Sequence, residues 1–436
     1  MDYLSTFAKI KRYAQTTSAV GGMATRLAGD KYLNIPLNDA AYSKALRKTL
    51  GNLKGPLMKV AQFLATIPDA LPEEYATELL TLQSQAPSMG IPFVKRRMQA
   101  ELGVDWQTHF QEFDLKASAA ASLGQVHKAT DLNGNVLACK LQYPGMASLI
   151  DADLGQLNII FNLYEKFNNA IKTADIKKEI KERLFEELDY KNELKNLKTY
   201  ATFFKNNPRI HIPKPYVALC TDRLLTLEWI EGTSIFTKLG EPQEYRNNLG
   251  KLLFQAWYEP FYKKGMIHAD PHPGNYLVSN DEPLSITLLD FGCVRYFSST
   301  FIDGVKNLYN ALKTNDQDLA VHAYTQWGFH NLNNEIIEII TNWAKLLYDP
   351  LLDDSVRTIQ QTASGAKGWE MAQKVHNTLH KAGGIRPPQE FVFMDRAAVG
   401  IGSVLMRLNA QQNWHQLFEE MIHSNALPLK PNINAD

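Results

Sequence analysis

The segment HADPHPGN, residues 268–275, gathers polar side chains between two apolar stretches. Within it Asp270 and Asn275 are five residues apart, and fifteen residues after Asn275 the tripeptide DFG begins at Asp290. Carboxylate and amide oxygens are ligands that Mg²⁺ prefers, and a further carboxylate near a hydroxyl group can orient it for attack. We therefore predict a phosphoryl-transfer site in which Asn275 and Asp290 bind the metal and Asp270 orients the acceptor.

A lysine on a strand supplies the positive charge that such a site needs. Lys140 ends the apolar stretch VLACK, whose alternation directs it to the face opposite Cys139. A lysine in this position contacts the α- and β-phosphates of ATP in kinases. Taken alone, Lys140 would more often be a solvated lysine on an edge strand. Because the lysine, the loop and DFG follow the order of a kinase centre, we predict ATP and Mg²⁺ as cofactors.

The two histidines of the loop allow another interpretation. His268 and His272, together with Asp270, could ligate a transition metal. However, two prolines restrict this loop, and histidine readily donates and accepts hydrogen bonds within such a scaffold. We favour the scaffold role.

Hydrophobic periodicity predicts a helical unit in the first hundred residues. Apolar side chains recur at intervals of three and four over residues 45–65 and 72–83. Residues 7–32 mix apolar and basic side chains, which suits either a docking helix or contact with a membrane surface, and we favour the docking helix.

The elements that should position the chemical groups follow this unit. The turn signal Asn133-Gly134 before residues 136–143 predicts a hairpin, with a third strand nearby. A charged stretch, 175–200, predicts one long helix, and short strands continue to about residue 230. Helices dominate the remainder, including residues 394–408, where small residues on one face suggest close packing, although we favour an ordinary structural helix.

Composition limits the class of protein. The chain has 436 residues, of which 45% are apolar and 21% charged, as in ordinary globular proteins. It contains 46 basic and 46 acidic residues, so no net field attracts nucleic acid, and we expect no nucleic-acid partner. Three widely spaced cysteines without a CxxC pattern indicate a reducing, cytoplasmic location. The sequence predicts no signal peptide and no transmembrane helix.

Two further stretches, ASAAASLGQVHKA at 117–129 and KVAQ at 59–62, complete a recognisable set of motifs. Together with Lys140, HADPHPGN and DFG, they resemble the UbiB/AarF-domain atypical kinases, also called ADCK proteins. The resemblance runs from about residue 40 to about residue 330. It implies an α+β, bilobed protein-kinase-like fold with a helical N-terminal extension and a helical C-terminal region.

This resemblance divides the chain into four parts. Residues 1–112 should form a helical extension, and residues 113–232 an N-lobe with an alanine-rich loop. Residues 233–330 should form a C-lobe with HADPHPGN and DFG, and residues 331–436 a helical region with a tail.

The resemblance also implies roles for individual residues. The family has an alanine-rich loop where typical kinases have a glycine-rich one, and it is matched by Ala119, Ala120, Ala121 and Ser122. Added methyl groups limit the approach of the backbone to phosphate, so nucleotide placement should differ from that in typical kinases. The family's KxGQ motif, which packs across the would-be peptide site, is matched by Lys59 and Gln62, with Ala61 in place of the glycine.

Acidic residues of the charged helix match two more family features. Glu187 and Asp189 match the ExD motif, and Glu193 matches the acidic partner of the strand lysine. Helix geometry alone leaves Glu186, Glu187 and Glu193 open as that partner, because successive residues point about 100° apart. The run LEWI at 227–230 resembles the hinge between kinase lobes, where backbone groups of Glu228 and Ile230 could bond adenine; ordinary core packing is the alternative.

The resemblance implies ATP hydrolysis or small-molecule phosphorylation in the biosynthesis or handling of ubiquinone or another prenyl lipid. The expected partners are ATP, a prenyl-quinone or other isoprenoid lipid, and a membrane contacted peripherally. Two alternatives stay open: a nucleotide-gated lipid-binding or chaperone-like protein, and a soluble small-molecule kinase. The intact set of Asp270, Asn275 and Asp290 disfavours the first, and KVAQ with the alanine-rich loop disfavours the second.

Overall fold

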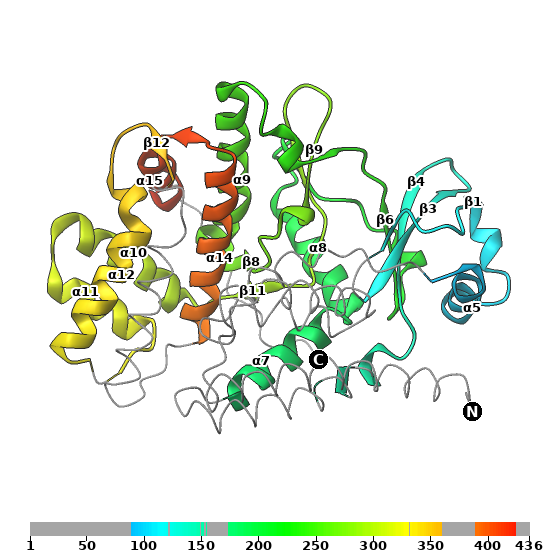
Figure 1. Cartoon of the computed structure of the whole chain (residues 1–436), viewed down its shortest axis with the longest axis horizontal. Helices are drawn as coiled ribbons and strands as arrows, with labels where there is room; N and C mark the ends of the chain where they lie inside the picture. The colour runs from blue at the N-terminus through cyan, green and yellow to red at the C-terminus, as the bar shows by residue number, and fades with distance from the viewer. Residues whose placement is uncertain are drawn as a thin grey trace, which may run out of the picture. The chain divides into compact units, whose positions relative to one another are not determined.

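The computed structural model divides the chain into two compact units (Figure 1). The first contains residues 1–194 and 215–229, and the second contains residues 195–214 and 230–436. The structure describes residues 89–120, 123–148, 150–151, 154, 173–330, 332–359 and 389–423. Several predicted segments lie outside these residues: 7–32, 45–65, 72–83 and the C-terminal tail.

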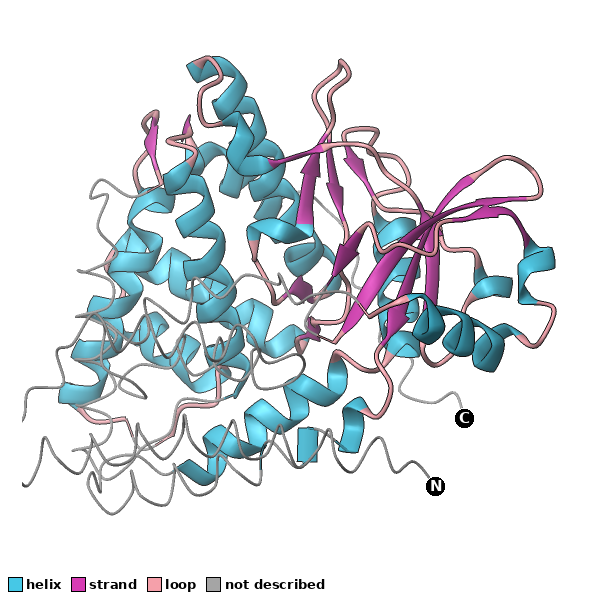
Figure 2. Cartoon of the chain, turned by 45° about the vertical axis from the view of Figure 1, so that its right-hand side comes forward, coloured by secondary structure: helices cyan, strands magenta, loops and turns pink. Residues whose placement is uncertain are grey.

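A five-stranded antiparallel sheet forms the centre of the first unit (Figure 2). Its order is β1-β3-β4-β6, and β2 pairs with β3 beside β1. The bounds are β1 (Phe110–Phe113), β2 (Ala119–Ala120), β3 (Gly124–Asp131), β4 (Val136–Gln142) and β6 (Leu224–Glu228). The predicted hairpin is confirmed as β3–β4, and its turn has Gly134 at φ +83°, a conformation that glycine adopts without strain.

Alternation along β4 gives this sheet two different faces. One face is a core with α5 (Ile91–Leu102), and its fully buried members on β4 are Leu137, Cys139 and Leu141. Lys140 therefore lies on the opposite face. Two short 3₁₀ helices, η1 (Trp106–His109) and η2 (Val217–Leu219), connect elements of this unit.

Two helices replace the single long helix that the sequence predicts over residues 175–200. They are α7 (Thr173–Glu186) and α8 (Tyr190–Phe203), and the prediction is wrong at the break between them. Asp189 causes the break, because its Oδ1 accepts the Asn192 N–H at 2.9 Å and so caps the start of α8. Apolar periodicity continues through the break and does not reveal it. Residues 190–194 of α8 belong to the first unit and the rest to the second.

Small sheets in the second unit carry the chemical motifs. The order β5-β10-β9-β7 joins β5 (Ile210–His211), β10 (Ile286–Leu288), β9 (Tyr276–Val278) and β7 (Thr233–Ser234). A separate pair joins β8 (Met266–His268) to β11 (Val294–Tyr296), and another joins β12 (Arg357–Thr358) to β13 (Gln411–Gln412).

Helices make up most of the other described residues of the second unit. They are η3 (Ile235–Lys238), α9 (Gln243–Lys264), η4 (Pro273–Asn275), α10 (Ser299–Thr314), α11 (Gln317–Gln326), α12 (Asn334–Leu352), α14 (Gln389–Arg407) and α15 (Trp414–His423). The predicted helix at 394–408 is thus confirmed as α14, which runs beside α9 (Figure 1). On α9 the fully buried Trp257 packs at 5.1 Å from His268 and 5.3 Å from Tyr276, measured between ring centroids. This helix therefore supports the strands on both sides of the HADPHPGN loop.

Among the helices that the structure describes, none is both long and apolar enough to cross a membrane.

Candidate active site

Two pairs of antiparallel strands bring the HADPHPGN loop beside DFG. The loop leaves β8 and enters β9, while DFG lies between β10 and β11. β8 pairs with β11, and β9 pairs with β10, so the two connections lie next to each other. Backbone hydrogen bonds join them directly, from Ala269 N to Cys293 O at 2.7 Å and from Leu289 N to Asn275 O at 3.0 Å.

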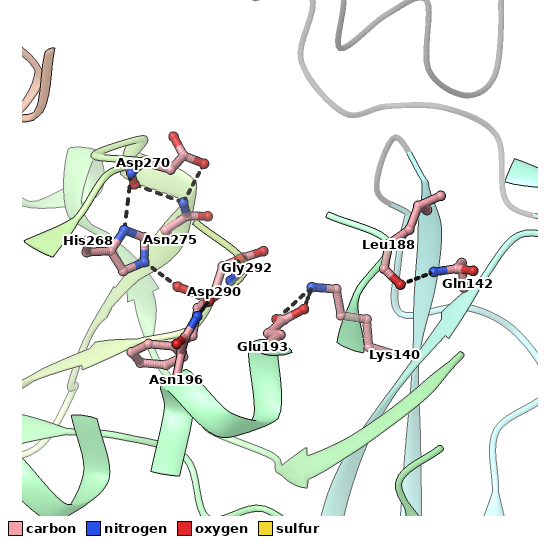
Figure 3. Close-up of polar contacts among 11 residues, drawn as sticks. Lys140, Gln142, Leu188, Glu193, Asn196, His268, Asp270, Asn275, Asp290 and Gly292 are labelled. Carbon is pink, nitrogen blue, oxygen red and sulfur yellow. Dashed lines mark hydrogen bonds and ion pairs between the residues drawn. The ribbon is translucent and has the colours of Figure 1, made fainter. Parts of the chain in front are cut away.

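Within the loop, Asp270 and Asn275 are hydrogen-bonded to each other (Figure 3). The Nδ2 of Asn275 donates to Asp270 Oδ2 at 3.0 Å and to the Asp270 carbonyl at 3.2 Å. A carboxylate can only accept, so the amide nitrogen of Asn275 must face Asp270. The Oδ1 of Asn275 is consequently directed away from Asp270, as a metal ligand from this side chain would have to be.

His268 connects the loop to DFG. Its Nδ1 accepts the Asp270 N–H at 3.3 Å, so its Nε2 carries the proton that is donated to the Asp290 carbonyl. His272 has a similar local role, because its Nδ1 accepts the Gly274 N–H at 3.1 Å. Both histidines thus act as scaffold. Within the described part of the chain, no group of three or more His, Cys, Asp or Glu is arranged to hold a metal ion.

Asp290 and Asn275 form a donor set suited to magnesium. The Asp290 Oδ1 accepts the Gly292 N–H at 2.9 Å, which orients the carboxylate. One carboxylate and one amide oxygen, completed by water and phosphate oxygens, is the kind of coordination that Mg²⁺ adopts. Burial, followed by the charge of Asp270, raises the pKa of Tyr276 well above its usual value, so this neighbour remains neutral. The residues present therefore fit the cofactor that the sequence predicts.

Lys140 and Glu193 form an ion pair within the first unit (Figure 3). The Nζ of Lys140 lies 2.8 Å from Oε1 and 2.9 Å from Oε2 of Glu193. The Glu193 side chain is only 2% exposed, while that of Lys140 is 23% exposed. Lys140 also lies 5.1 Å above the ring of Tyr190. The helix pattern left Glu186, Glu187 and Glu193 open as the acidic partner of Lys140. The structure shows that Glu193 binds Lys140.

The remaining predicted site residues belong to several elements of the fold or lie outside the described chain. Ala119 and Ala120 form β2 on β3, and Asp189 caps α8, next to Glu187. The Trp229 N–H bonds Val136 O on β4, so by strand alternation the backbone of Glu228 is directed away from β4. Ile230 follows in the second unit. Four predicted residues lie outside the described chain: Lys59, Gln62, Ala121 and Ser122.

Asn196 is a buried polar residue that the motifs did not identify. Its Nδ2 donates to the carbonyl of Phe291 in DFG at 3.0 Å, and its Oδ1 accepts the Tyr296 hydroxyl at 3.0 Å. With 1% of its surface exposed, it holds DFG from inside the second unit. The signal was available in the sequence, because Asn196 lies three residues after Glu193 and therefore on a similar face of α8.

Comparison with known proteins gives one family. A model described as the ABC1 atypical kinase-like domain matches residues 81–324, which include the loop, DFG, Lys140 and Glu193. A solved structure of Rv3197 with erythromycin, from Mycobacterium tuberculosis, matches with TM-score 0.60 and 24% identity. That match covers 94% of this chain and 100% of the other. The predicted α+β, protein-kinase-like fold is confirmed.

Curated relatives are similar over part of their length. The chloroplastic Protein ACTIVITY OF BC1 COMPLEX KINASE 8 of Arabidopsis thaliana is 31% identical over 66% of this chain and 38% of its own. AarF domain-containing protein kinase 1 of Xenopus tropicalis is 31% identical over 63% of this chain and 53% of its own. The mitochondrial atypical kinase COQ8 of Saccharomyces cerevisiae is 25% identical over 88% and 77%, respectively. The chain thus spans about four tenths to three quarters of these relatives.

Proposed function

Because this chain belongs to the ABC1 atypical kinase-like domain family, we propose that it binds Mg-ATP and hydrolyses it or transfers its γ-phosphoryl group. The observation that carries this proposal is the hydrogen-bonded arrangement of the loop beside DFG. There Asp270 holds the Asn275 amide, and His268 bonds the backbone of Asp290. Such an arrangement fixes the oxygen atoms that would bind the metal, and the separate carboxylate of Asp270, before nucleotide binds.

Each polar group then has one task. Asn275 and Asp290 would hold Mg²⁺, which when bound neutralises charge on the phosphate oxygens. Lys140, oriented by Glu193, would contact the α- and β-phosphates. Asp270 would orient the acceptor hydroxyl or water and accept its proton.

The family resemblance supports further assignments around the nucleotide. We propose that the alanine-rich loop, Ala119 to Ser122, covers the phosphates and that backbone groups of Glu228 and Ile230 bond adenine. We also propose that Lys59 and Gln62 serve as the family's KxGQ motif. Glu187 and Asp189 would serve as its ExD motif.

The physiological role that we propose is in the metabolism of ubiquinone or another prenyl lipid. The support is similarity to relatives named COQ8 and coq-8, both mitochondrial. A lipid acceptor or effector of this kind would require peripheral contact with a membrane, and protein phosphorylation is not proposed.

Melting temperature and phosphate release, measured with and without Mg-ATP, test the proposal. Wild type should gain thermal stability with Mg-ATP, since a ligand bound only by the folded state stabilises it. Asp290→Asn should lose the gain and the phosphate release. Asp281→Asn, the same change at an exposed position between β9 and β10, is the matched control and should behave as wild type. Equal responses from the two variants would refute the proposal.

A prenyl-quinone analogue in detergent separates turnover from lipid-dependent gating. If the analogue binds and Mg-ATP binds, but phosphate release remains absent under all conditions, the chain is a nucleotide-gated lipid-binding protein and our proposal of turnover fails.

A further inference from the structure

Helix α14 approaches the HADPHPGN loop at a position where it has no side chain. A Cβ atom added to Gly400 would lie 2.1 Å from Cγ, 3.1 Å from Cβ and 3.4 Å from Cδ of Pro271. Carbon atoms in ordinary contact are about 3.5–4.0 Å apart. A methyl group at residue 400 could therefore fit only if the loop or the helix moved by roughly 1.4 Å, the difference between 3.5 and 2.1 Å.

Neither side of this contact can yield easily. The ring of Pro271 is closed on its own backbone and cannot rotate away as a flexible side chain would. The helix is attached near both ends, by Glu390, which accepts the Ser298 N–H at 3.2 Å, and by Arg246, which donates to the Leu408 carbonyl at 2.8 Å. Between these ends, Ala397 and Ile401 are fully buried. A displacement would thus pass to the loop backbone.

We propose that Gly400 is a positioning residue, through which α14 sets the place of Pro271 and with it the carboxylate of Asp270. Pro271 directly follows Asp270, and Asp270 holds the Asn275 amide at 3.0 Å. A helix from the C-terminal region thereby forms one wall of the site. Glycine is a poorer helix former than alanine, so the close approach, and not helix stability, accounts for its presence.

Gly402 on the same helix provides a matched control. No atom of the described residues lies within 4 Å of a Cβ built there, apart from its chain neighbours and the helix's own backbone. Alanine at either position changes one hydrogen to a methyl group and improves helix propensity equally. Only Gly400→Ala should disturb the loop.

Hydrogen exchange of the full-length chain tests the contact without any assumption about activity. In Gly400→Ala, amides of residues 268–275 should exchange at least tenfold faster than in wild type, and in Gly402→Ala they should exchange as in wild type. Where phosphate release is measurable, Gly400→Ala should lower kcat by about 100-fold, the effect expected of a displacement near 1 Å, with a smaller change in the KM for ATP. Equal exchange in the two glycine variants would overturn the proposal.

A second variant keeps the test decisive if Gly400→Ala does not fold. Pro271→Ala removes Cγ and Cδ and leaves only the 3.1 Å approach to Cβ, so the double variant Gly400→Ala, Pro271→Ala should recover most of the melting transition and of the slow exchange of the loop. Failure of the double variant to recover either would also overturn the proposal. The activity measurement rests on the proposed function, whereas the exchange does not. Fast exchange in Gly400→Ala, alongside a wild type without phosphate release, would support the positioning role and refute the phosphoryl transfer.

Discussion

Replacing Lys140 by methionine should destabilise this protein more than replacing Glu193 by glutamine, although both changes break the same ion pair. The reason is the unequal exposure of the partners. Glu193 is 2% exposed, so without Lys140 its carboxylate stays buried and loses the ammonium group that faces it at 2.8 Å. Lys140 is 23% exposed, so without the carboxylate its ammonium can reach water and keeps its contact with the Tyr190 ring at 5.1 Å.

The magnitude follows from the geometry. At 2.8 Å and an effective dielectric constant of about 20, the attraction between the charges is about 6 kcal/mol before desolvation is subtracted. Removing one partner of a buried pair costs about 3–5 kcal/mol, and we expect Lys140→Met to lie in this range. Glu193→Gln retains an oxygen acceptor and leaves the more exposed charge, so we expect a loss of about 1–2 kcal/mol.

Urea unfolding of the two single variants and of the double variant measures these losses. The double variant leaves no buried charge and should be more stable than Lys140→Met alone. Lys116→Met, at an exposed position, is the control for introducing methionine and should change stability by less than about 0.5 kcal/mol. Equal losses from the two single variants, or losses that simply add in the double variant, would refute the reasoning.

Three further changes test individual contacts. Asp189→Ala should lower the free energy of unfolding by about 1 kcal/mol through loss of the α8 cap, and Asp189→Ser should retain most of it, as measured in urea. Asn196→Ala leaves the Phe291 carbonyl and the Tyr296 hydroxyl without their shared partner and should cost about 1–3 kcal/mol, whereas Tyr296→Phe, which removes only one of the two bonds, should cost less. Burial tends to raise the pKa of Glu419, but hydrogen bonds from Lys313, Tyr309 and His423 outweigh it and lower the pKa from 4.5 to about 2. The stability from ionised Glu419 is therefore complete above about pH 4.5 and is lost as the pH falls towards 2, so melting curves of Glu419→Gln should vary less than those of wild type in that window; parallel curves would contradict this.

The sequence predicts which residues belong to the site better than it predicts the hydrogen bonds and ion pairs between them. The order and spacing of Asp270, Asn275 and Asp290 predict one site, and adjacent antiparallel strand pairs bring the HADPHPGN loop beside DFG. The partner of Lys140 required the resemblance, since a helical pattern gives the phase of a helix only and cannot choose between neighbouring glutamates. The break at Asp189 was missed because a cap depends on one side-chain hydrogen bond and not on periodicity.

Contacts between distant segments were beyond prediction for a different reason. The small residues of α14 indicated close packing, but nothing near Gly400 in the chain specifies Pro271 as the neighbour. Such a pairing depends on how α14 is placed against α9 and β8, which is a property of the whole unit.

The C-terminal helices belong to the same unit as the HADPHPGN loop, although the family match ends at residue 324. α14 and α15 belong to the same unit as the HADPHPGN loop, and each contributes side chains that are at most 1% exposed: Ile401, Leu405, Trp414 and Phe418. Burying a large apolar side chain stabilises a fold by about 1.5–3 kcal/mol, so four of them contribute about 6–12 kcal/mol. This is a gross contribution, which the conformational entropy lost on ordering the two helices opposes. The unit that holds the HADPHPGN loop therefore includes buried helices beyond the matched segment, and under our proposal for Gly400 the position of Pro271 depends on one of them.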